Sequence, residues 1–173
     1  MQAKTDNPAS LDIGLLLYPG AQRAAVHGLA DLFLVANRVV AELGAVELPS
    51  ARISFWQADE AGRLQLAPEG PPAAAADLRV LIIPPSLESA PQGELLERHR
   101  ASLCQLHGHG TVLASVCIGV FFIAASGLLD GRPACTHWNY VHSLAQRFPK
   151  VRVEAQQPLL DGELVVVEQF AGA

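Results

Sequence analysis

The stretch that decides the fold is Val112-Leu-Ala-Ser-Val-Cys-Ile-Gly-Val120. Its first half is an apolar run of the kind found in a buried strand, and this run leads directly into Cys117. Two residues later Gly119 begins a second apolar run, which predicts a buried helix as far as Ala125. A strand, a sharp turn that carries a nucleophilic residue, and a helix together make a nucleophile elbow. The segment therefore predicts that Cys117 lies at the carboxyl end of a central strand.

Further strands and helices alternate on both sides of this stretch. Apolar runs that end at Pro or Gly, or that alternate with polar residues, predict strands at Leu11–Tyr18, Ala51–Ala58, Leu64–Ala67, Leu78–Ile83, Thr111–Val116, Val151–Glu154 and Glu163–Val167. Apolar residues three and four positions apart predict helices at Ala24–Leu43, Gly93–Leu106, Gly119–Ala125 and Tyr140–Arg147. The last two strands are expected to flank a turn at Asp161-Gly162. This alternation predicts an α/β fold with a mostly parallel sheet.

Length and composition limit the classes of function. The chain has 173 residues, of which 50% are apolar and 17% charged, so it is long enough for one domain with a real core. A net charge of −5 gives it no basic surface for phosphates, and any contact with DNA must come from another part of the protein. Cys104, Cys117 and Cys135 form an odd set, which indicates reduced cytosolic thiols rather than a disulfide framework.

Neither a targeting signal nor a membrane span is expected. The first ten residues are polar and do not form a signal peptide. Val112–Leu129 carries no charge and reaches the lower limit of transmembrane length, but serines and glycines interrupt it. We interpret it as a central strand followed by a buried helix. The expected location is the cytoplasm.

A cysteine at an elbow lies near free N–H groups at the start of a helix, which favour the thiolate and can stabilise an oxyanion. His137, in Ala134-Cys-Thr-His-Trp138, is the candidate base, because it follows a strand end at the same sheet edge. Both residues also have a structural interpretation. Cys117 can simply fill a tight turn, and His137 can be hydrogen-bonded at a strand terminus. The pattern alone leaves these alternatives open.

Other motifs carry less chemistry. His107-Gly-His109 has no acidic or thiol partner nearby in sequence, so we interpret it as a helix-ending turn and expect no metal site. Gly14 and Gly20 do not complete a dinucleotide fingerprint, and no cofactor is expected. Trp56 and Trp138 are candidate core residues, and Trp138 is also placed to form the wall of a small pocket beside His137.

Three segments carry a family resemblance. Residues 114–132 (ASVCIGVFFIAASGLLDGR), Ala134-Cys-Thr-His-Trp138 and Leu144-Ala-Gln-Arg-Phe-Pro149 resemble the class I glutamine amidotransferase-like, or PfpI/ThiJ, superfamily. Within it they are most similar to the ligand-sensing amino-terminal domains of AraC-type transcription regulators. The resemblance implies a doubly wound, flavodoxin-like sheet with Cys117 in the elbow and His137 beside it. It also implies that residues 1–173 form a single domain without its last helix, followed in the full-length protein by a helix-turn-helix DNA-binding domain.

The sequence departs from the catalytic members of that superfamily at two places. Those members carry a glutamate in the early helix, at the position that Ala25 occupies here. They also follow the third strand with a glycine pair whose N–H groups complete an oxyanion hole. This chain has Pro84-Pro85 there, and proline has no N–H to donate. Both departures favour a sensor over an enzyme.

The resemblance and its departures together predict the effector-sensing and dimerisation domain of an AraC-type transcription regulator. A small polar metabolite, such as an amino acid or a quaternary amine, is expected to bind near Cys117, Ile118, His137, Ser86 and Trp138. The expected partners are a second copy of the chain, the effector, and DNA through the following domain only. One alternative is a cysteine-dependent hydrolase, hydratase or glyoxalase-like enzyme that uses Cys117 and His137. Another is a redox sensor in which Cys117 is oxidised.

Overall fold

The computed structural model describes residues 10–45, 47–71, 78–154, 159–160 and 164–167. Its strands are β1 (Leu11–Leu17), β2 (Ala51–Ala58), β3 (Leu64–Leu66), β4 (Val80–Ile83), β5 (Val112–Val116), β6 (Pro133–Ala134), β7 (Arg152–Val153), β8 (Leu159–Leu160) and β9 (Leu164–Val167). Its helices are α1 (Arg23–Glu42), α2 (Glu94–Gly108), α3 (Val120–Ser126) and α4 (Val141–Arg147). Short 3-10 turns precede the last two helices, η1 (Cys117–Gly119) and η2 (Trp138–Tyr140).

The main sheet has the strand order β3-β2-β1-β4-β5-β9-β8. All pairs between β2 and β9 in this order are parallel, and the edge strands β3 and β8 pair antiparallel. The prediction of a doubly wound, mostly parallel sheet is therefore confirmed. The chain winds from β1 through α1 to β2 on one side and continues through β4 and β5 on the other, so the direction of winding changes between β1 and β4.

The pairing expected at the end of the chain is wrong. Val151–Glu154 does not form a hairpin with the strand at 164–167. Its central part, β7, pairs in parallel with β6 in a separate small sheet. The antiparallel partner of β9 is β8, which the sequence analysis missed. The turn at Asp161-Gly162 lies outside the described residues.

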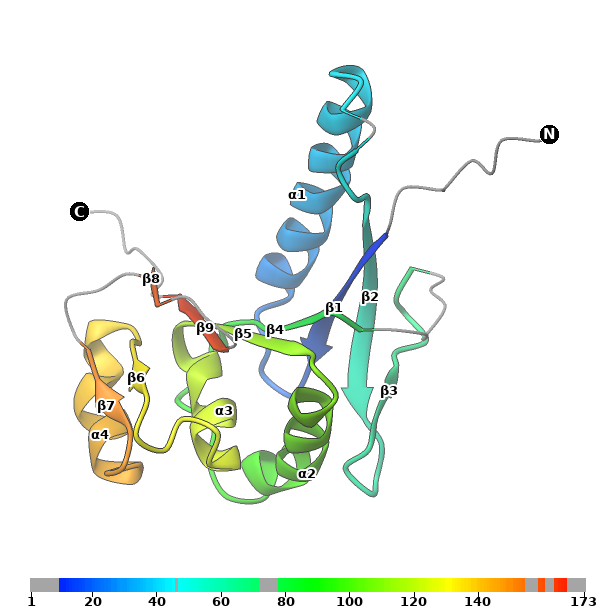
Figure 1. Cartoon of the computed structure of the whole chain (residues 1–173). Coiled ribbons are helices and arrows are strands. Elements are labelled where there is room, and N and C mark those ends of the chain that lie inside the picture. Colours follow the sequence, from blue (N-terminus) through cyan, green and yellow to red (C-terminus); the bar gives the residue numbers. More distant parts are fainter. Residues whose placement is uncertain (1–9, 46, 72–77, 155–158, 161–163, 168–173) are drawn as a thin grey trace.

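Helices cover both faces of the main sheet, with α1 on one face and α2 and α3 on the other (Figure 1). Strand β1 is buried on both faces, because Ile13 and Leu15 join the cluster under α1 while Leu16 joins the larger cluster under α2 and α3. This two-sided burial explains why β1 reads as a continuous apolar run. The interpretation of the uncharged stretch is also confirmed, since its second half forms α3, whose residues are almost all buried.

A charged pair and an amide fix the position of β2. Asp12 and Arg52 lie opposite each other in the parallel register, and the Arg52 guanidinium donates to both carboxylate oxygens of Asp12, at 2.7 and 2.5 Å. The Asn37 side chain donates to the carbonyl of Ala51 and accepts from its N–H, both at 2.8 Å. Helix α1 is thereby anchored over the start of β2.

Helix α1 is long and apolar enough, by length and composition, to cross a membrane, and only 11% of that span is buried. One such helix is weak evidence of a membrane span. Val26, Leu29 and Phe33 pack against the sheet from this helix. We therefore interpret α1 as part of the domain with one unusually exposed side.

Candidate functional site

The elbow after β5 has the geometry that the sequence predicted. Cys117 has φ +56°, and among the described residues other than glycine it alone has a positive φ. This left-handed conformation costs an ordinary residue about 1–2 kcal/mol, so the surrounding structure must hold it. Gly119 lets the turn pack closely against the end of β4, because a Cβ at this position would lie 2.5 Å from the carbonyl oxygen of Ile83. Only glycine permits this close approach.

Cys117 is buried, at 7% exposed, within the larger hydrophobic cluster. Tyr18, at the end of β1, lies near enough to interact with it electrostatically. Burial, and to a smaller extent Cys117, raises the pKa of the Tyr18 hydroxyl well above its ordinary value. The hydroxyl therefore keeps its proton and donates a hydrogen bond to the carbonyl oxygen of Pro84, at 2.7 Å. Tyr18 thus holds the end of β1 beside the elbow.

The loops after β1 and β4 are joined by hydrogen bonds at the point where the winding changes direction. Gln22 N–H donates to the Pro85 carbonyl at 2.8 Å, and Leu87 N–H donates to the Gly20 carbonyl at 3.3 Å. The Ser86 hydroxyl donates to the same Gly20 carbonyl at 2.6 Å and accepts from an N–H of its own loop. Ser86, a predicted ligand-binding residue, therefore already connects these loops.

Two chemical features that the resemblance assigns to catalytic members, a carboxyl group and a pair of N–H donors, have no counterpart beside the elbow. The first turn of α1, where Ala25 lies, contains no acidic residue. Pro84 and Pro85 present carbonyl oxygens, which accept hydrogen bonds from Tyr18 and Gln22. These positions supply neither a carboxyl group for the thiol nor N–H donors for an oxyanion.

The structure brings the His137 segment to the elbow. The buried Thr136 hydroxyl donates to the Cys117 carbonyl at 3.1 Å. His137 is half-buried and its Nδ1 accepts from Asn139 N–H at 3.3 Å, which fixes the ring at the start of η2. Its ring centre lies 5.2 Å from that of Trp138. Trp138 is 67% exposed, so its interpretation as a core residue is wrong, and only its role as a pocket wall stays a prediction.

The remaining sequence candidates have structural positions. Ile118 is 1% exposed in the core cluster, so its side chain serves packing. Trp56 is buried, as expected, and its indole N–H donates to Ser54 at 2.8 Å. Helix α2 ends at Gly108, which confirms His107-Gly-His109 as a helix-ending turn. In the described part of the chain, no three His, Cys, Asp or Glu side chains are grouped to hold a metal.

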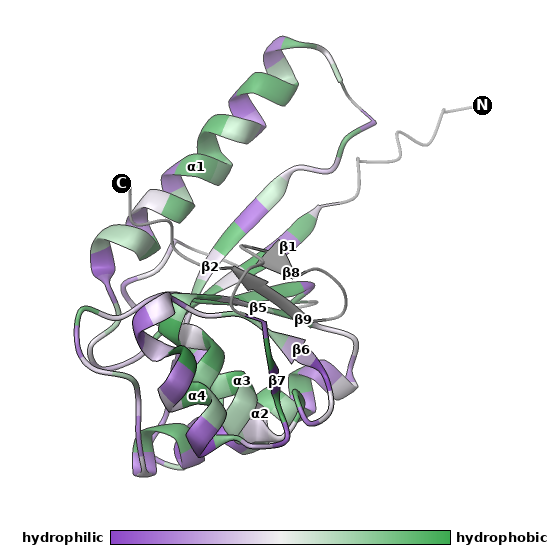
Figure 2. Ribbon diagram, turned by 90° about the vertical axis from the view of Figure 1, so that its left-hand side faces the viewer, coloured by the Kyte–Doolittle hydropathy of each residue, from purple (hydrophilic) through white to green (hydrophobic). Residues whose placement is uncertain are grey.

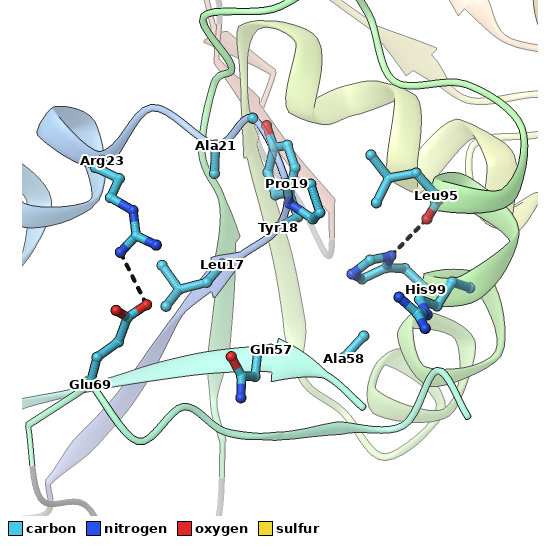
Figure 3. A pocket seen from close by; sticks show the side chains of 12 residues that line it. Leu17, Tyr18, Pro19, Ala21, Arg23, Gln57, Ala58, Glu69, Leu95 and His99 are labelled. Carbon is cyan, nitrogen blue, oxygen red and sulfur yellow. Dashed lines mark hydrogen bonds and ion pairs between the residues drawn. The ribbon is translucent and has the colours of Figure 1, made fainter. Parts of the chain in front are cut away.

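A cavity of about 400 Å³ opens at the carboxyl ends of β1 and β2, beside Tyr18 (Figure 3). Helix α2 forms one wall with Leu95 and His99, and the exposed ion pair between Arg23 and Glu69, 3.0 Å long, closes the opposite end. A smaller cavity of about 210 Å³ lies on the other side of Tyr18 and includes Ser86 and Glu88.

Sequence reasoning missed His99. It is 1% exposed, and its Nδ1 donates to the Leu95 carbonyl at 2.7 Å while its ring packs edge-on against Phe122. Burial, and then the nearby Arg98, lower the pKa of the ring, so it is neutral at pH 7 with its proton on Nδ1. Nε2 is then a buried acceptor, and no described residue donates a hydrogen bond to it. The signal was available in the sequence, because Leu96, His99 and Leu103 share the inward side of α2.

Solved structures with this fold fall into two groups. An AraC family transcriptional regulator from Pseudomonas putida has a TM-score of 0.64 at 20% identity, covering 91% of this chain and 83% of that one. Drosophila melanogaster DJ-1beta has a TM-score of 0.65 at 15% identity, covering 92% and 82%. A ThiJ/PfpI family protein from Pseudomonas syringae has a TM-score of 0.57 at 19% identity, covering 96% and 66%. The chain therefore has the fold of these AraC-family, DJ-1 and ThiJ/PfpI proteins, which confirms the fold that the resemblance in the sequence implied.

Relatives by sequence are fewer. No protein-family model matches the chain. A Streptomyces lividans protein, called "Uncharacterized protein in cpoL 5'region", is 34% identical over 142 residues, covering 78% of this chain and 93% of that protein. The chain belongs to the same family as this protein. The HTH-type transcriptional regulator ArgR of Pseudomonas aeruginosa is 31% identical over 157 residues, covering 80% of this chain but only 40% of ArgR.

Gly119→Ala should destabilise the elbow. The added Cβ meets the Ile83 carbonyl, so β4 or η1 must shift, and we expect the free energy of unfolding to fall by about 3 kcal/mol. Urea denaturation followed by circular dichroism measures this. Gly28→Ala is the matched control, because its Cβ would meet nothing within 4 Å and should stabilise α1 by about 0.5–1 kcal/mol. Equal changes in the free energy of unfolding for Gly119→Ala and Gly28→Ala would show that the contact with the Ile83 carbonyl does not constrain position 119.

His99 should make the fold acid-sensitive. In the unfolded chain a histidine takes up a proton below pH about 6.5, whereas folded His99 resists protonation because burial lowers its pKa. Its contribution to the free energy of unfolding is therefore present above that pH and is lost as the pH falls, by at most about 1.4 kcal/mol per pH unit. His99→Phe should flatten the pH dependence of urea denaturation, whereas the exposed His109→Phe should not. Parallel curves for the wild-type protein and His99→Phe would show that His99 is not the cause.

Proposed function

We propose that this chain is the effector-sensing domain of an AraC-type transcription regulator and that a small polar metabolite binds it beside the cysteine elbow. One observation carries the proposal: the elbow keeps its strained geometry at Cys117, while the first turn of α1 has no acidic residue and Pro84-Pro85 after β4 have no N–H to donate. The likeness to ArgR supports a regulator. The net charge of −5 fits a domain that leaves DNA contact to another part of the protein.

The effector site is proposed at the carboxyl edge of the sheet, where the winding changes direction and ligands of open α/β sheets bind. Cys117, Ser86 and the backbone of Ile118 form its inner side, and His137 and Trp138 its outer side. Thr136 ties the outer side to the elbow. The neighbouring rings of His137 and Trp138 suit an amino acid or a quaternary amine, since a cation binds favourably over an aromatic face.

The second candidate is a cysteine-dependent hydrolase, hydratase or glyoxalase-like enzyme. The left-handed conformation of Cys117 favours it, because strain at an elbow is typical of a positioned nucleophile. A redox sensor based on oxidation of Cys117 uses the same feature. Both need a reactive thiolate, whereas the sensor proposal needs only a bound ligand.

Binding without turnover is the expected result. Choline and the L-amino acids should include a compound that raises the melting temperature of the chain, and His137→Ala together with Trp138→Ala should abolish that rise. Amide, ester, glyoxal and isocyanide substrates should show no acceleration above the Cys117→Ala variant. A rate that disappears in Cys117→Ala would instead establish the enzyme. A stoichiometric loss of the Cys117 thiol under mild peroxide, with Cys104 intact, would favour the redox sensor.

The exposed side of α1 supports the proposal that the domain dimerises. Arg23 and His27 lie on one flank of α1, where they contact Glu69 and Phe55. A helix advances about 100° per residue, so Leu32, Val39 and Leu43 lie on the flank opposite Arg23 and His27, whereas Leu34 lies on the same flank as these two residues. Figure 2 shows apolar residues along this helix, and the large exposed ones are Leu32, Leu34, Val35, Val39 and Leu43. AraC-type regulators grip paired half-sites with two copies, which fits a symmetric contact through this helix.

The chain should therefore be a dimer at micromolar concentration, with about twice the monomer mass of 18.4 kDa in light scattering. The double change Leu32→Glu and Val39→Glu should give a folded monomer, because a dimer would bury the four new carboxylates. Leu87→Glu is the control, since Leu87 is 80% exposed and lies on the loop after β4. A wild-type protein that remains monomeric, or a double variant that remains dimeric, would contradict a contact through α1.

A further inference from the structure

One wall of the cavity between α2 and the ends of β1 and β2 carries a polar atom, His99 Nε2, to which no described residue donates a hydrogen bond. His99 Nδ1 donates to the Leu95 carbonyl, but Nε2 is buried and has no hydrogen-bond partner among the described residues. The His99 ring packs edge-on against Phe122. A phenylalanine at position 99 would make the same ring contact without the cost of an unpaired acceptor. An unpaired acceptor at a cavity wall is explained if a ligand supplies the donor.

The orientation of the ring agrees with this. In Figure 3 the His99 ring leaves α2 and points into the space between Tyr18 and Ala58. The Tyr18 hydroxyl points away from that space to its partner, the Pro84 carbonyl, and so does not compete for Nε2. Since Nδ1 carries the proton, Nε2 accepts a hydrogen bond, and the group that approaches it must be an O–H or an N–H.

The other polar groups of the cavity favour an anion. Arg23 and Arg98 line it together with one carboxylate, Glu69, and so leave an excess of positive charge. Arg98 lies next to His99 on α2, and its hydrogen bond to the Glu60 carbonyl is long, at 3.4 Å. Between these ends the lining is apolar, with Leu17, Pro19 and Ala58. A volume of about 400 Å³ suits a small organic molecule.

We propose that this cavity is a ligand site for small carboxylates that carry a hydroxyl or amino group, with the donor on His99 Nε2 and the carboxylate on the Arg98 guanidinium. Nε2 lies just behind the cavity wall, so the side chains around it move slightly when the donor enters. The site lies on the β2 side of Tyr18, apart from the proposed effector site at Cys117. It does not rest on the proposed function, because its residues are separate from those of the elbow.

The test is isothermal titration of the intact chain with matched pairs of acids. L-Alanine, L-lactate, L-glutamine and 2-hydroxyglutarate have both groups. Propionate is the partner of the first two, glutaramate of L-glutamine and glutarate of 2-hydroxyglutarate, and these partners lack the donor next to the carboxylate. At least one acid of the first set should bind with a Kd below about 1 mM, and its partner without the donor should bind at least about tenfold more weakly. His99→Phe should weaken binding by about tenfold or more while leaving the melting temperature unchanged or higher.

Two further variants locate the carboxylate. Arg98→Gln should also weaken binding about tenfold, whereas Arg100→Gln, an exposed arginine two residues further along α2, should not. The proposal is overturned if none of the four acids binds up to about 10 mM, or if binding survives both His99→Phe and Arg98→Gln. Binding that survives both changes but is lost in His137→Ala would assign the acids to the elbow, which would sustain the proposed function without this site. Binding that is lost in His99→Phe and in Arg98→Gln but survives in His137→Ala would support this site and leave the elbow without a ligand.

Discussion

The close passage of Gly119 over the carbonyl of Ile83 is the constraint on which the site depends. It lets the first turn after β5 lie directly against the end of β4, and it brings α3 into the core as a buried helix. Cys117 is then forced into a left-handed conformation at the edge of the sheet. The strain is maintained by packing, since α3 offers Phe121 and Phe122 to the core. A strained elbow of this kind does not require a catalytic role, because the packing of α3 against the end of β4 depends on the same turn.

Tyr18 divides the carboxyl edge of the sheet into two regions. On one side lie the elbow and the joined loops after β1 and β4, and on the other lies the cavity with His99. The tyrosine is held in place by burial and by its bond to Pro84. A ligand on either side would contact the same ring.

Much of the fold could be predicted from the sequence, because long apolar runs and helical periodicity are strong signals. The 51–58 strand and the elbow at Cys117 were placed correctly on that basis. The pairing of β7 was not, since β6 and β7 are two-residue strands without a recognisable pattern. The site was harder still. The helical spacing of Leu96, His99 and Leu103 could have shown that His99 faces inward, but not that its Nε2 lacks a partner, and the bond of Ser86 to Gly20 joins residues far apart in the chain.

The pair between Asp12 and Arg52 has a consequence for how the chain finds its sheet. Strands β1 and β2 are separated by a long helix, so their alignment is decided by the side chains that meet. If β2 slid by one residue, Asp12 would lie opposite Ala51 or Ile53, and a nearly buried carboxylate would lose its partner. Such a slip would also turn the inward residues of β2 to the wrong face. One ion pair thus penalises the nearest misaligned sheets during folding, a kind of selectivity that stability measurements on the finished protein do not reveal.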